Sequence, residues 1–135
     1  IGAYGLVGGG LLLLLYTASL YELPPMQWGM ALLMAPVAGR WFMTVAQHHF
    51  PYLRSQGLGT LVPSQQWALW RGILPLGLAL FGGWVLVACL LVVLLLSYGV
   101  ARWMARQLGG GLTGDCYGAL CEITQVLWLV TCCIP

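Results

Sequence analysis

The sequence predicts an all-α, polytopic helical membrane protein with about five transmembrane helices in a single membrane domain, residues 1–135. Composition is the first reason: 6% of the 135 residues are charged and 61% are hydrophobic, whereas soluble domains carry about 25% charged residues. The same composition excludes a disordered chain, which needs low hydrophobicity and high charge. The second reason is a series of apolar runs of about 20 residues, the length that crosses a bilayer.

The first two crossings are expected over residues 2–20 and 28–46. Backbone polar groups in lipid must bond within their own segment, so each run is predicted to be helical. Pro24 and Pro25 separate the two runs, because proline has no N–H group and clashes with the preceding helical turn. A more polar stretch, residues 47–66, follows and is expected to be the longest loop.

The apolar run over residues 67–107 is too long for one crossing, because 41 residues would extend about 60 Å as a helix. It must therefore fold back once. Gly82 and Gly83 are the cheapest place for the reversal, since glycine adopts turn conformations without steric cost. The third and fourth helices are accordingly expected over residues 65–81 and 84–107.

A glycine-rich loop, residues 109–114, leads into a fifth helix expected over 117–134. The loop spells G-x-G-x-x-G, but a dinucleotide-binding fingerprint follows a strand, and here a membrane helix precedes it. No Lys follows the glycines, so the loop is not a P-loop either. Thr113 or Asp115 is expected to cap the fifth helix. Whether Asp115 only caps this helix or also has a functional role stays open.

Arginine is unevenly distributed between the two sides of the predicted membrane domain. With five alternating helices, the N-terminus, the 47–66 loop and the glycine-rich loop share one side, close to four of the five Arg: Arg54, Arg71, Arg102 and Arg106. The positive-inside rule makes this side cytoplasmic. The chain has no basic cluster, so nucleic acid is not an expected partner.

The remaining polar residues are expected to collect near the same side. Arg40 lies eight residues before His48, and Glu122 lies seven after Asp115, so both belong to the cytoplasmic halves of their helices. Only Glu22 belongs to the other side. A charged residue at a helix centre costs roughly 2.5–3.5 kcal/mol, and such residues usually line a cavity. The sequence therefore predicts a polar pocket that opens to the cytoplasm.

The fifth helix is expected to carry one small and polar face. Five residues recur there at three- and four-residue steps: Asp115, Gly118, Ala119, Glu122 and Gln125. Small residues let another helix approach, which would bring Glu122 into the bundle interior, with Leu120 and Leu127 pointing elsewhere. Glu122 either pairs with Arg40 or Arg71 or takes part in catalysis, and both alternatives stay open. The five cysteines have neither disulfide-framework nor metal-site spacing and are interpreted as packing residues.

Taken in order, these residues resemble the cobalamin synthase family, the adenosylcobinamide-GDP ribazoletransferases. The sequence over 110–122, G-G-L-T-G-D-C-Y-G-A-L-C-E, is similar to the family's G-G-x-T-G-D-x-x-G-A-x-x-E. Residues 54–59, R-S-Q-G-L-G, resemble its R-x-x-G-L-G loop, and Arg40 aligns with an Arg of the preceding helix. Residues 1–5 resemble the end of a K-D-S-x-I-G-x-x-G stretch. The matches span nearly the whole chain and correspond to the C-terminal half of a cobalamin synthase.

This resemblance implies a transferase of cobalamin biosynthesis in the bacterial cytoplasmic (inner) membrane, with its site facing the cytoplasm. Its substrates would be adenosylcobinamide-GDP and α-ribazole or its phosphate, and its cofactor Mg²⁺. The family's acidic D-G-x-x-D segment, which the resemblance implies holds the catalytic metal, precedes the part seen here. The chain is therefore expected to be inactive alone, whether it is a truncation, half of a split enzyme or a relic. Its partner would be the missing N-terminal half or a second copy.

The resemblance also implies roles for individual residues. Asp115 and Glu122 would be catalytic residues and metal ligands. Position 125 is Gln where the family commonly has another Glu, which puts a metal role there in doubt. The implied substrate-binding residues are Arg40, Arg54, Gly57, Gly59, Thr113 and Gly114.

Two other classes of protein compete with this interpretation. A non-enzymatic membrane component, such as a small transporter subunit or helical scaffold, could use the same polar pocket. It would place polar residues through the full bilayer depth, whereas here nearly all charge is on one side, which favours an enzyme. A CDP-alcohol phosphotransferase would need a D-x-x-D-G-x-x-A-R type signature, which the three acidic residues do not provide.

Overall fold

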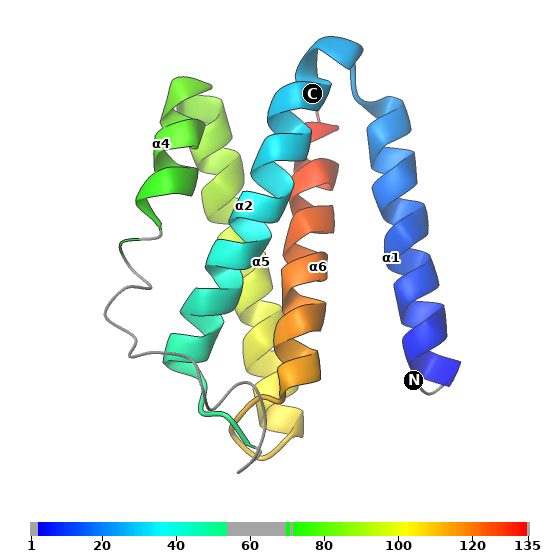
Figure 1. The fold of residues 1–135 in the computed structure, drawn as a ribbon, viewed down its shortest axis with the longest axis vertical. Coiled ribbons are helices and arrows are strands. Elements are labelled where there is room, and N and C mark those ends of the chain that lie inside the picture. The colour runs from blue at the N-terminus through cyan, green and yellow to red at the C-terminus, as the bar shows by residue number, and fades with distance from the viewer. Residues whose placement is uncertain (1–2, 54–69, 71, 135) are drawn as a thin grey trace.

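The computed structural model describes residues 3–53, 70 and 72–134, and within them it is an antiparallel bundle of α-helices (Figure 1). The expected all-α fold class is confirmed. The only β feature of the described residues is an isolated bridge between Tyr52 and Leu112. The helices are α1 (Ala3–Glu22), α2 (Pro25–His49), α4 (Ile73–Phe81), α5 (Trp84–Gln107) and α6 (Gly114–Cys132).

The helix bounds agree with the expected segments, with differences at the ends. α5 covers the residues expected for the fourth helix. α2 begins at Pro25. Proline is tolerated in the first turn of a helix because the N–H group that it lacks would have no helical partner there. α2 also continues to His49, so the start of the expected 47–66 loop is helical instead. The third helix was expected from residue 65; α4 is described from Ile73, and residues 54–69 lie outside the described part.

Consecutive helices run in opposite directions, so the connections gather at two ends of the bundle (Figure 1). We call the end with residues 50–53 and 108–113 the loop end, and the end with residues 22–25 and 82–83 the turn end. The expected reversal at Gly82 and Gly83 is confirmed. Gly83 has φ +96°, a backbone conformation that favours glycine.

Three of the five described helices, α1, α2 and α5, are long and apolar enough to cross a membrane. α6 has 19 residues and would span about 28 Å, close to the thickness of a hydrocarbon core, but it carries two carboxylates. The nine described residues of α4 would span only about 14 Å. The chain is therefore a membrane protein, with three membrane-length helices among those described and the short α4 at the edge of the bundle (Figure 1).

The core lies where α2, α5 and α6 meet. Near the turn end it contains Met34, Leu90 and Trp128, and near the loop end Phe42 and Leu120. All five of these side chains are almost fully buried.

A buried hydroxyl pair joins α5 to α6 within this core. Thr124 Oγ1 lies 2.9 Å from Ser97 Oγ and 2.7 Å from the carbonyl oxygen of Leu120. The polar groups of both residues are therefore satisfied without water, as burial requires.

Candidate functional site

At the loop end, the chain after α2 is tied to the glycine-rich loop by backbone hydrogen bonds. The N–H of Leu53 donates to the carbonyl of Leu112 over 3.0 Å, and the N–H of Leu112 donates to the carbonyl of Pro51 over 2.9 Å. These bonds form the parallel bridge between Tyr52 and Leu112. We call this contact between residues 51–53 and 111–112 the loop clasp.

Glycines make both the turn and the close approach of the loop clasp. The N–H of Gly110 donates to the carbonyl of Ala105 over 2.7 Å, as in the Schellman ending of a helix. Gly109 and Gly110 have φ +88° and +106°, which favour glycine. A Cβ atom on Gly111 would lie 2.5 Å from the carbonyl oxygen of Pro51. The glycines therefore serve chain reversal and packing here, which accounts for their spacing without a nucleotide fingerprint.

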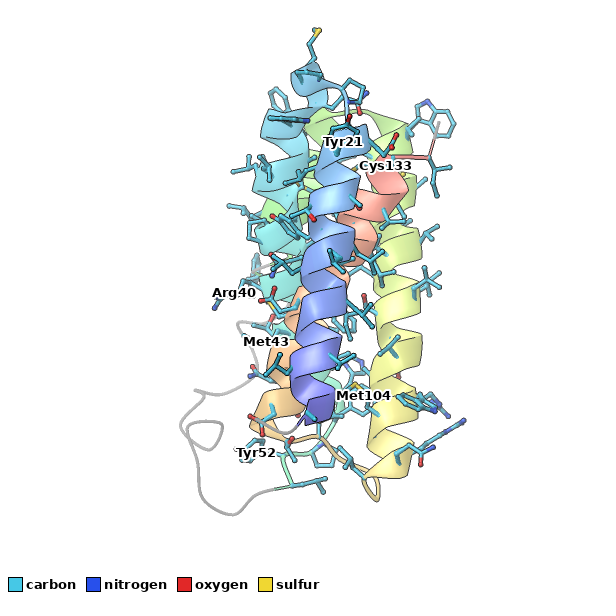
Figure 2. The ribbon with its side chains drawn as sticks, turned by 90° about the vertical axis from the view of Figure 1, so that its right-hand side faces the viewer. Tyr21, Arg40, Met43, Tyr52, Met104 and Cys133 are labelled. Carbon is cyan, nitrogen blue, oxygen red and sulfur yellow. The ribbon has the colours of Figure 1, made fainter. Side chains whose placement is uncertain are left out.

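Two tyrosines strengthen the contact at the start of α6. The hydroxyl of Tyr117 donates to the carbonyl of Phe50 over 2.9 Å. The rings of Tyr52 and Tyr117 stack with centroids 6.4 Å apart and an angle of 17° between their planes. Sequence reasoning assigned no site to any tyrosine, because a contact between residues 67 positions apart leaves no local pattern. Figure 2 shows Tyr52 at the loop end.

Removing the Tyr117 hydroxyl should loosen this end of the bundle. We expect Tyr117→Phe to lower the free energy of unfolding by about 1 kcal/mol, because the Phe50 carbonyl loses its donor while the ring stacking remains. Thermal unfolding in detergent measures the change. Tyr21→Phe, at a tyrosine that is 85% exposed at the turn end, is the matched control and should have no effect. Equal midpoints for the two variants would contradict the expectation.

The loop clasp brings two of the motif segments together. Leu53 is the residue before Arg54, and Leu112 is the residue before Thr113. The clasp therefore holds the residues that precede the R-x-x-G-L-G segment beside the residue that precedes the T-G-D segment. Arg54, Gly57 and Gly59 themselves lie outside the described residues.

Thr113 is the N-cap residue of α6, one of the two residues expected there. Its hydroxyl donates to Cys116 Sγ over 3.2 Å and makes no capping hydrogen bond to the backbone. Gly114 and Asp115 form the first turn of α6, and both are exposed. A carboxylate in this turn interacts favourably with the positive end of the helix dipole.

Arg40 and Glu122 lie at the same level of the bundle, as their positions in the sequence predict. The reason is the contact of α2 with α6: a Cβ atom on Gly39 would lie 2.7 Å from the carbonyl oxygen of Cys121. Arg40 and Glu122 are the next residues on the two helices. Each lies eight or nine residues from the loop end of its helix, or about 12–14 Å.

The expectation that Glu122 occupies the interior of the bundle is wrong for the described chain. Glu122 is exposed, and so is Arg40, whose side chain points away from the helices in Figure 2. The buried face of α6 holds larger side chains, including Tyr117, Leu120 and Trp128. In a bilayer, where lipid tails are as apolar as these side chains, helices associate through van der Waals packing, and the larger side chains make more such contacts than the small and polar face would. Leu120, expected to point away from the small face toward lipid or a neighbouring helix, packs in the core.

The described part of the expected polar pocket, Arg40 and Glu122, is therefore exposed rather than enclosed. Within the described residues no ion pair joins Arg40 to Glu122; a pair with Arg71 lies outside them. A pocket does occur at the turn end, among residues that include Glu22, Met30, Cys89 and Trp128. Figure 2 shows Tyr21 and Cys133 at that end, far from Tyr52.

The described residues do not make a metal site by themselves. No group of three His, Cys, Asp or Glu side chains among them could hold a metal ion. Asp115 and Glu122 lie seven residues apart on α6, which separates their Cα atoms by about 10.5 Å along the helix axis. These two carboxylates are therefore too few and too far apart to define a Mg²⁺ site alone.

The fold and the loop clasp define a class of protein: a membrane-embedded helical bundle in which the chain after α2 is joined to the loop before α6 at one end. The cobalamin-5-phosphate synthase family model matches residues 1–133, and the chain belongs to this family. The resemblance on the motif residues is thereby confirmed.

Several similar curated proteins carry the name adenosylcobinamide-GDP ribazoletransferase. The relative from Desulforamulus reducens is 37% identical over 134 residues, which are 96% of this chain and 53% of the relative. The Roseiflexus sp. relative is 41% identical over 77% of this chain and 40% of its own length. The Deinococcus radiodurans relative is 38% identical over 96% of this chain and 46% of its own. The chain thus spans about half the length of these relatives. No solved structure matches it.

Proposed function

We propose that this chain supplies part of the site of an adenosylcobinamide-GDP ribazoletransferase. The observation that carries the proposal is the loop clasp, which holds residues 51–53, just before the R-x-x-G-L-G segment, against Leu112, just before the T-G-D segment. The names of the relatives support the activity. The exposed face with Arg40 and Glu122 supports a site that opens outward from this chain rather than one enclosed by it.

The proposed reaction joins two substrates through one phosphate. A hydroxyl oxygen of α-ribazole, or of its phosphate, forms a bond to the phosphorus of the cobinamide-linked phosphate. The bond from that phosphorus to the oxygen of GMP breaks, and the hydroxyl proton is released. The products are adenosylcobalamin, or its phosphate, and GMP. Such a transfer depends on positioning and on neutralising phosphate charge.

Different residues of the proposed site have different roles in this transfer, according to their chemistry. Arg40 and Arg54 bind phosphate oxygens, since guanidinium groups match them with paired donors. Thr113, Gly114, Gly57 and Gly59 provide a hydroxyl and backbone that a substrate can approach closely.

Asp115 and Glu122 act as carboxylates toward the substrates and as ligands of the proposed Mg²⁺ cofactor. A bound Mg²⁺ would supply further neutralisation of phosphate charge. Since these two carboxylates do not define the cation site alone, its other ligands must come from outside the described residues. The carboxylates are therefore proposed here only as contributors to that site.

We place the protein in the bacterial cytoplasmic membrane, with the loop end toward the cytoplasm. Arg102 and Arg106 support this orientation, because both are exposed in the loop-end part of α5. Cationic residues beside a membrane helix favour the cytoplasmic side.

The test is release of GMP. The purified chain, given Mg²⁺ and both substrates, should release none alone. Adding the segment of the Desulforamulus reducens relative that the match does not cover should start the release. Turnover by the chain alone would contradict the need for a partner. No turnover with the added segment, under conditions in which the full-length relative is active, would instead favour the non-enzymatic membrane component.

A substitution of Glu122 tests whether its carboxylate contributes to turnover. In a full-length relative, the substitution equivalent to Glu122→Gln should lower turnover about 10²-fold, because the amide keeps the shape and loses the charge. The equivalent of Glu22→Gln, at an exposed carboxylate of the turn end, is the control and should leave turnover unchanged. Wild-type turnover of the first variant would remove Glu122 from the site.

A further inference from the structure

One face of the bundle near the loop end has no packing partner in the described chain. Gly118 is exposed, and a Cβ atom there would meet no atom within 4 Å. Glu122, one turn further along α6, is also exposed, as is Arg40 on α2. Gly39 differs, because a Cβ atom there would lie 2.7 Å from the carbonyl oxygen of Cys121 on α6. We call Gly118, Glu122 and Arg40 the open face.

The loop-end half of α1 is equally uncovered. Three consecutive glycines there, Gly8, Gly9 and Gly10, would each present a Cβ atom to open space. Only 6% of the membrane-length part of α1 is buried, compared with 39% of α2. The small-residue stretch of α1 begins five residues into the helix, and Gly118 lies four residues past Gly114, so both are within about 8 Å of the loop end.

Lipid is a poor occupant of the open face. Arg40 and Glu122 lie two or more helical turns inside their helices, and ionised side chains at such depth usually face protein or a polar cavity. Small residues such as glycine allow a second membrane helix to approach closely, and an exposed glycine that faces only lipid makes no such contact. The combination of exposed charge and exposed glycine thus fits a protein partner with polar groups of its own.

We propose that the open face and the loop-end half of α1 bind transmembrane helices of the segment that the curated relatives have in addition to the matched part. Two relatives are covered over only 53% and 46% of their length, so each has roughly as much chain again. Docked there, the segment would surround Arg40 and Glu122 and complete the polar pocket. The role of this pocket rests on the proposed function. The docking itself does not, because it can be measured without turnover.

Copurification tests the docking. The tagged chain is produced in membranes together with the uncovered segment of the Desulforamulus reducens relative and is solubilised in a mild detergent. The segment should copurify with the wild-type chain, and Gly118→Leu should reduce its recovery at least tenfold. Gly99→Leu on α5 and Gly77→Leu on α4 are matched controls, since both glycines are exposed and meet nothing within 4 Å. Both controls should leave the recovery unchanged.

Thermal unfolding of the chain alone should show the same or a slightly higher midpoint for Gly118→Leu than for the wild type, because the added side chain enters open space and leucine favours a helix over glycine. Failure of the wild-type chain to retain the segment would overturn the proposal. So would unchanged recovery with Gly118→Leu, or loss with Gly99→Leu instead. Two differently tagged copies of the chain that copurify through the same face would assign it to a second copy, which also overturns it. Docking without GMP release would leave this inference standing and contradict only the proposed activity.

Discussion

Replacing Gly111 by alanine should lower the turnover of a full-length family member about 10²-fold, if the substitution is made at the equivalent position. A Cβ atom at Gly111 would lie 2.5 Å from the carbonyl oxygen of Pro51 and 2.8 Å from the side chain of Leu53. The Pro51 carbonyl accepts one of the two hydrogen bonds of the loop clasp, so it cannot move away without breaking that bond. The segment leading to Arg54 would then shift relative to Thr113. GMP release measures the loss.

The control for this prediction is Gly99→Ala, because a Cβ atom on Gly99 meets nothing within 4 Å. Amide hydrogen exchange supplies a second measurement that needs no substrate. The N–H groups of Leu53 and Leu112 should exchange faster in the Gly111 variant, since both donate within the clasp. Faster exchange with unchanged turnover would show that the clasp forms and yet does not position the site.

Replacing Gly39 by alanine should destabilise the chain by about 1–3 kcal/mol, the usual cost of overpacking a well-packed contact. The added Cβ atom would lie 2.7 Å from the carbonyl oxygen of Cys121 and 2.8 Å from Cγ of Gln125. The Gln125 side chain can rotate away, but the Cys121 carbonyl belongs to the backbone of α6. Relief therefore requires α2 and α6 to separate. Thermal unfolding in detergent measures the effect.

Gly29→Ala is the matched control, since Gly29 lies on the same helix and a Cβ atom there meets nothing within 4 Å. Alanine favours a helix over glycine by about 1 kcal/mol, so this variant should unfold at the same or a slightly higher temperature. If Gly39→Ala were as stable as Gly29→Ala, the close contact of α2 with α6 would be refuted. The common level of Arg40 and Glu122 would then lose its structural basis.

Much of the fold followed from local features of the sequence. The apolar runs marked the helices, and α5 has the bounds expected for it. Pro24 and Gly83 marked two chain reversals, because one lacks a backbone donor and the other adopts a positive φ without strain. The motif residues indicated the family that the comparison then confirmed.

The orientation of α6 did not follow from its sequence. The recurrence of Asp115, Gly118 and Glu122 showed that they share a face, but not whether that face meets this chain or another partner. The small residues were interpreted as the contact with the rest of the bundle. In the structure α6 packs against the bundle through larger side chains, among them Leu120 and Trp128, while Gly118 and Glu122 of the small face are exposed.

By itself, then, the sequence determined the membrane setting, the helices, the chain reversals and the family, because each depends on composition or on residues close together in the chain. Only the tertiary structure decided which face of α6 is buried and that residues 51–53 pair with 111–112. Burial depends on which helices meet, which no single helix encodes. The pairing is made by backbone N–H and carbonyl groups, which every non-proline residue carries and which therefore leave no mark in the sequence.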